Sequence, residues 1–122
     1  MEPLQSLLSE IEIVFTNAVP DKNWDRIKVR VFAISTFLQM KGVYFIGEKE
    51  VSYNPNVKTP SGTHASIRVS EMRKMMYDMD PEKGAWYTMV VEIDKSGKFK
   101  VNYDYDNKPE FTLRAFKREI YG

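Results

Sequence analysis

Residues 86–106 read WYTMVVEIDKSGKFKVNYDYD, and this stretch decides the fold. Apolar side chains alternate with polar or charged ones on both sides of a central DKSG turn at 94–97, and a period of two is typical of half-buried β-strands. Pairing Ile93 with Phe99 sets Asp94 beside Lys98 and leaves a three-residue loop at 95–97. Glycine at the last loop position, Gly97, readily supplies the positive φ that such loops need. The stretch therefore predicts a β-hairpin.

The pattern also predicts the register, because residues opposite each other in an antiparallel pair point to the same side of the sheet. The inner face then carries three further apolar pairs, Val91 with Val101, Met89 with Tyr103, and Tyr87 with Tyr105. On the outer face Glu92 lies beside Lys100, and a one-residue slip would destroy this opposite-charge pair. At the open end of the hairpin, the outer face is expected to carry Trp86 beside Asp104 and Asp106.

The chain is 122 residues long, which fits one domain spanning 1–122 with a single hydrophobic core. Hydrophobic residues make up 43% and charged residues 29%, a balance too apolar for a disordered chain. Without cysteine, neither disulfides nor thiolate chemistry are available. No secretion signal and no apolar run of roughly 20 residues is present, so we expect a cytoplasmic protein that does not bind membranes. The formal net charge of +1 gives no footprint for direct nucleic-acid binding.

Two segments with apolar residues at a three-and-four spacing predict helices, at 3–18 and at 69–79. Ser70 is the expected N-cap of the second helix. Four methionines share one side of that helix: Met72, Met75, Met76 and Met79. Such a stripe is usually core, although methionines also form adaptable binding surfaces. The tail at 110–122 predicts either a short terminal helix or an edge strand.

The segment between the helices has the pattern of strands. From Trp24 to 34 apolar residues alternate with cations, which predicts a strand with a basic, solvated outer face. Lys41 and Gly42 then predict a turn, and β-rich runs at 43–46 and around 51–53 predict two more strands. Together these runs indicate an antiparallel meander.

Few residues offer chemistry. Asp104 and Asp106 lie two residues apart on one strand face, roughly 7 Å apart, so they can hold a metal or share acid and base roles, or simply continue a polar face. His64, the only histidine, sits in the loop at 54–66 without nearby ligands or a nucleophile. No phosphate-binding glycine loop, zinc spacing or nucleophile elbow is present. The sequence therefore indicates a protein that is not an enzyme, needs no metal or cofactor, and works by binding a partner.

The open end of the hairpin is the candidate surface, because it combines an aromatic side chain with carboxylates, which anchor and orient protein partners. We expect partner contacts from Trp86, Asp104 and Asp106, followed by Asp78, Asp80, Glu82 and Glu110. In the alternative interpretation, Trp86 packs under the first helix and the acids are merely solvated.

The motifs NWDRIKVRV at 23–31 and AWYTMVVEIDKSGKFKVNYDYD at 85–106 resemble the YezG-like antitoxin, or immunity protein, family of bacteria. Trp24, Trp86, the GKF motif at 97–99 and the YDYD motif at 103–106 carry most of this resemblance. It implies a small α+β protein that binds a cognate bacterial toxin, often a nuclease, and neutralises it. An inhibitor of a basic nuclease is usually acidic, so the near-neutral net charge leaves two explanations: either the toxin is not strongly basic, or the acids gather on one face. Residues 101–110 hold three acids and one lysine, which favours gathering.

We therefore expect an α+β fold in which an antiparallel sheet, a meander plus a C-terminal hairpin, has its helices packed on one face. We expect an immunity protein that occludes the active site of its toxin, with carboxylates in place of substrate phosphates or by steric cover. The alternative is a small-molecule-binding domain or minor enzyme. Its pocket would lie between helix and sheet and be lined by Asp104, Asp106 and tyrosines.

Overall fold

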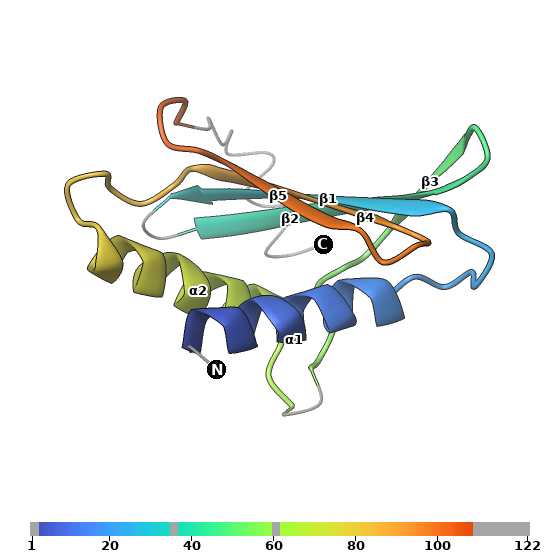
Figure 1. Cartoon of the computed structure of the whole chain (residues 1–122), viewed down its shortest axis with the longest axis horizontal. Coiled ribbons are helices and arrows are strands. Elements are labelled where there is room, and N and C mark those ends of the chain that lie inside the picture. Colours follow the sequence, from blue (N-terminus) through green and yellow to red (C-terminus); the bar gives the residue numbers. More distant parts are fainter. Residues whose placement is uncertain (1–2, 35–36, 60–61, 109–122) are drawn as a thin grey trace.

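The computed structural model describes residues 3–34, 37–59 and 62–108. Two helices and five strands follow one another along this part of the chain (Figure 1): α1 (Pro3–Asn17), β1 (Arg26–Ile34), β2 (Phe37–Ile46), β3 (Lys49–Tyr53), α2 (Ala65–Met79), β4 (Thr88–Asp94) and β5 (Phe99–Asp104). The sheet is antiparallel and both helices cover the same face, as Figure 1 shows. The predicted α+β fold is confirmed.

The five strands lie in the order β3-β2-β1-β4-β5, so the meander and the hairpin join through β1 and β4. Val29 in the middle of β1 is opposite Val91 of β4, and both side chains are buried. In the hairpin Ile93 is opposite Phe99, and the pairing continues in the register that the sequence predicts as far as Thr88 and Asp104. Glu92 is opposite Lys100 as expected, but its ion pair is with Lys28 of β1, at 3.8 Å.

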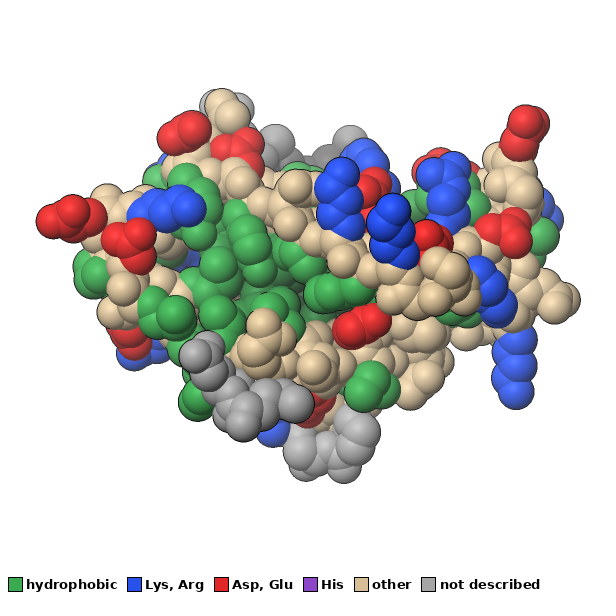
Figure 2. Space-filling model, viewed as in Figure 1, with side chains coloured by type: hydrophobic (Ala, Val, Ile, Leu, Met, Phe, Trp, Pro, Cys, Tyr) green, Lys and Arg blue, Asp and Glu red, His purple; other side chains and the backbone are tan. Residues whose placement is uncertain are grey.

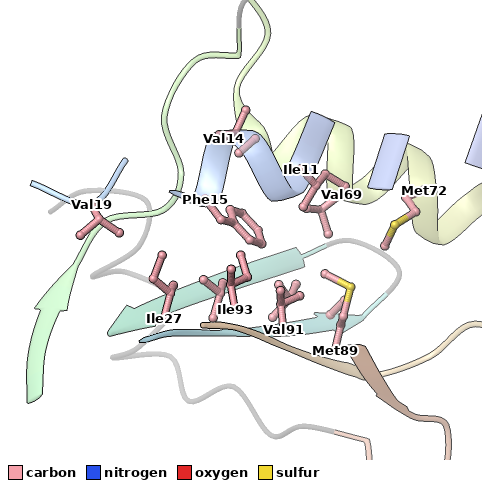
Figure 3. Close-up of a cluster of buried hydrophobic side chains, with 14 of the residues drawn as sticks. Ile11, Val14, Phe15, Val19, Ile27, Val69, Met72, Met89, Val91 and Ile93 are labelled. Carbon is pink, nitrogen blue, oxygen red and sulfur yellow. The ribbon is translucent and has the colours of Figure 1, made fainter. Parts of the chain in front are cut away.

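The core lies between the sheet and the helix pair (Figure 3). Helix α1 contributes Phe15 and α2 contributes Met72, and both pack over the inward side chains of β1 and β4. Phe15 and Met72 have no exposed surface, and each fully buried side chain of this size stabilises the fold by roughly 1.5–3 kcal/mol. The two helices are also linked by an ion pair between Arg68 and Glu10, at 3.4 Å. The core thus holds both helices against the sheet.

The predicted turn at Lys41 and Gly42 is wrong, because β2 runs without interruption from Phe37 to Ile46. Gly42 lies in mid-strand, opposite Val29 on one side and Tyr53 on the other. The ring of Tyr53 fills the space that a side chain at Gly42 would need: a Cβ there would lie 2.8 Å from Cε1 of Tyr53. Glycine serves close packing here rather than a change of chain direction.

The second helix begins earlier than predicted, at Ala65 with His64 as the N-cap residue, so Ser70 lies inside the helix. His64 makes no capping hydrogen bond with its side chain, and the segment is instead held by a β-bridge between Lys58 and His64. The methionines do not form one buried stripe: Met72 is fully buried, whereas 65% of Met79 is exposed. The last turn of α2 therefore projects beyond the core.

None of the helices in the described part of the chain is long and apolar enough to cross a membrane.

Candidate partner-binding site at the open end of the hairpin

Trp86 does not lie on the outer face of the hairpin, contrary to the sequence-based expectation. Strand β4 begins only at Thr88, and the chain before it leaves the strand alternation, so Trp86 turns toward the helices and is 0% exposed. Its ring lies 5.9 Å from that of Tyr103 and its carbonyl oxygen accepts a hydrogen bond from Nε of Arg73 on α2, at 2.6 Å. Trp86 is therefore part of the core and cannot contact a partner in this structure.

Asp104 ends β5 and organises the turn that follows it. Its Oδ1 accepts hydrogen bonds from the backbone N–H groups of Asp106, at 2.9 Å, and Asn107, at 3.1 Å, and its Oδ2 accepts one from the Asn107 side-chain amide, at 3.0 Å. The carboxylate thus caps its own turn, as Asp often does. Asp106 is exposed at the tip of that turn and makes no ion pair within the described part of the chain. The turn holds Asp106 out toward solvent.

The hydrogen bonds also keep Asp104 charged. The side-chain amide of Asn107 contributes most and the two backbone N–H groups add to it, so the pKa of Asp104 lies below its ordinary value. We expect Asn107→Ala to raise that pKa toward the ordinary value of Asp, as measured by the ¹³C shift of the carboxyl carbon against pH. Because the folded-state pKa is lowered, the stabilisation is present above the unfolded pKa near 3.9 and is lost as pH falls through the folded value. An unchanged pKa in Asn107→Ala would contradict this role of the amide.

The exit of α2 lies beside this turn. Lys83 places its Nζ 4.5 Å from the centre of the Tyr105 ring, a cation–π contact that ties the α2–β4 loop to the end of β5. In the same loop Asp80 caps α2, its N–H donating to the carbonyls of the last turn, and Glu82 is exposed. Asp78 is exposed and pairs with Lys74 at 3.2 Å. Acidic side chains gather at this end of the molecule, at the left in Figure 2.

We call this group, Asp78, Asp80, Glu82, Asp104 and Asp106, the acidic end. Residues 78–83 hold three acids and one lysine, and residues 104–108 hold two acids and one lysine, whereas the whole chain has a net charge of +1. Acids thus outnumber lysines in both segments, which favours gathering over a toxin that is not strongly basic. Glu110, the remaining predicted contact, lies outside the described residues.

The pocket in the alternative interpretation is divided between two places. Asp104 and Asp106 line a shallow surface hollow of about 540 Å³ with Lys83, Tyr103 and Tyr105. A separate groove of about 560 Å³ does lie between helix and sheet, but α2 and the β1–β2 pair form it and it contains none of the predicted aspartates. Groups of three or more potential metal ligands do not occur among the described residues.

Sequence reasoning missed two functional candidates, Lys83 and Arg73. Lys83 stands alone among acids in the 78–83 segment, and nothing in the sequence indicates that it reaches Tyr105. Arg73 carried a signal: it falls at the i+4 position of an apolar helical stripe that also contains Val69, Met72 and Met76, where a charged residue is unusual. The structure shows that this arginine faces the sheet and binds the carbonyl of Trp86.

The sequence profile of one family, described as immunity protein YezG-like, matches residues 4–121, which is nearly the whole chain. The chain belongs to this family, so the resemblance drawn from the hairpin motifs is confirmed and the protein is an immunity protein with a toxin as its partner. No curated protein sequence matches the chain closely enough to count as a relative.

Proposed function

We propose that this immunity protein neutralises a nuclease toxin by covering its active site with the acidic end. The local excess of acids in a chain of nearly neutral net charge carries the proposal. A nuclease cleft is cationic because it binds phosphates, and carboxylates that face it gain favourable electrostatic energy in both encounter and complex.

The fixed position of the Asp104 carboxylate supports the proposal. Asp104 is fixed by three hydrogen bonds to its own turn, and the contact between Lys83 and Tyr105 holds the second group of acids next to it. A preformed arrangement of charges loses little conformational entropy when the partner binds. Inhibition is then stoichiometric and leaves the immunity protein chemically unchanged.

Toxin binding is tested by neutralising three exposed acids while keeping their shapes: Asp80→Asn, Glu82→Gln and Asp106→Asn in one variant. The partner is the toxin recovered by pull-down from the native host with the tagged protein. We expect the affinity to fall by about 10- to 100-fold, mainly through slower association, and the loss to shrink at high salt. Affinity and association rate are measured by surface plasmon resonance, and protection by survival on co-expression.

The matched control is Glu48→Gln with Glu50→Gln, which removes two exposed acids near the β2–β3 turn, on the edge of the sheet opposite β5. This control should bind the toxin as tightly as the wild type. An equal loss per removed charge in both variants would mean that only net charge matters. Full binding by the acidic-end variant would mean that the toxin uses another surface.

A further inference from the structure

A groove between α2 and the β1–β2 pair has one apolar wall and one polar wall. Its wall on the sheet side is apolar and includes Ile34 and Leu38, and its wall on the helix side is polar, with Ser70, Arg73 and Tyr77. The volume of about 560 Å³ falls within the range of small-molecule sites, in which apolar walls surround a few convergent polar groups.

Two cations line this groove, Arg73 and Lys74, and the side chain of Arg73 is held in place by the core. Its Nε donates to the carbonyl oxygen of Trp86 at 2.6 Å, and its guanidinium carbon lies 5.6 Å from the centre of the Trp86 ring. Because Trp86 is fully buried, this contact anchors the guanidinium to the core. The remaining guanidinium nitrogens are not bound to a carboxylate in the described part of the chain.

Among the described residues, this arrangement leaves the half-buried charge of Arg73 without an acidic partner. The neighbouring cation, Lys74, pairs with Asp78, and none of the ion pairs among the described residues includes Arg73. Burial lowers the pKa of Arg73 because desolvation disfavours the charged form, yet a guanidinium stays charged at neutral pH. A partly desolvated charge gains most from a charged partner, and the planar fork of Arg fits a carboxylate with two parallel hydrogen bonds.

We propose that this groove is a binding site for a small carboxylic acid with an apolar body. The carboxylate binds the free edge of the Arg73 guanidinium, with the Ser70 hydroxyl on the same side of α2, and the apolar body lies against Ile34 and Leu38. Neither Ser70 nor Arg73 belongs to the acidic end, so this site and the toxin-binding proposal stand or fall separately.

The test uses octanoate as the probe and ¹⁵N-labelled full-length protein. Saturable shifts are expected at the Nε–H of Arg73 and at the backbone amides of Leu38 and Ala85. Octanol, which has the same tail without the charge, should bind at least about tenfold more weakly, because a hydrogen-bonded charge adds that much affinity. Equal shifts with octanol, or no saturable shift with octanoate, would overturn the assignment.

Two variants and one control test whether octanoate binds Arg73, so the test does not depend on removing Arg73 alone. Arg73→Gln should abolish octanoate binding, but it also removes the contact with Trp86 and can weaken the fold. Ser70→Asp keeps Arg73 and places a carboxylate three residues before it on the exposed side of α2, where the new side chain should occupy the guanidinium and block octanoate. Ser70→Asn, the neutral match, places no carboxylate beside the guanidinium and should bind octanoate more tightly than Ser70→Asp does. Equal binding by Ser70→Asp and Ser70→Asn would contradict the site.

A capped Leu-Glu-Leu peptide distinguishes the source of the carboxylate, because it offers the same chemistry as a protein side chain. Octanoate should bind at least as tightly as this peptide. Binding of the peptide alone would overturn the assignment to a free acid.

Discussion

Trp86→Ala is expected to lower the free energy of unfolding by about 3–5 kcal/mol, the usual cost of deleting a large buried aromatic side chain. Trp86 is 0% exposed, packs on Tyr103, and lies beneath the guanidinium of Arg73. Its loss leaves a cavity where α2, the α2–β4 loop and the hairpin meet, so the acidic end would also lose its support. Urea unfolding followed by circular dichroism measures the change.

Two controls separate the packing of Trp86 from other effects. Trp86→Phe keeps an aromatic ring and removes an indole N–H that donates to no acceptor within the described part of the chain, so we expect a loss of only about 1–2 kcal/mol. Tyr77→Ala alters a side chain that is 43% exposed and should change stability by no more than about 0.5 kcal/mol. If Trp86→Ala kept full stability but lost toxin binding, the tryptophan would be a surface contact after all.

The hairpin could be predicted in detail because its information is local. Alternation, turn chemistry and opposite charges all indicated the same register, and the pairing of Ile93 with Phe99 follows it. Alternation does not show where a strand begins, however. Continued back to Trp86 it placed the indole on the wrong side, because the energy gained by burying a ring of that size outweighs two residues of regular strand.

The acidic end and the groove differ in the same way in how far the sequence predicts them. The acids of the acidic end were found from composition, since charged residues in short exposed loops stay near their sequence neighbours. The groove was missed because it joins residues that are far apart in the chain, Leu38 from β2 and Arg73 from α2. A charged residue on an apolar helical stripe was the one local indication, and the buried carbonyl that it binds is set by tertiary packing.

The glycine in the middle of β2 is a second place where packing overrides local pattern, and it yields a prediction of its own. Gly42→Val is expected to destabilise the fold by about 1–3 kcal/mol through overpacking, even though valine favours strands. A Cβ at position 42 would lie 2.8 Å from Cε1 of Tyr53 and 3.1 Å from Cδ of Pro55. The free energy of unfolding in urea measures the effect.

Tyr53 cannot easily move away from a new side chain at Gly42. Its hydroxyl donates to the carbonyl oxygen of Phe15 on α1 at 3.0 Å, and Tyr44 contacts its ring edge to face with 5.9 Å between the centres. A double-mutant cycle therefore tests the cause: with Tyr53→Ala in the background, Gly42→Val should cost less, because the ring is gone and Cδ of Pro55, at 3.1 Å, is the close contact that stays. An equal cost in both backgrounds would show that the glycine is needed for its backbone and not for the ring that lies over it.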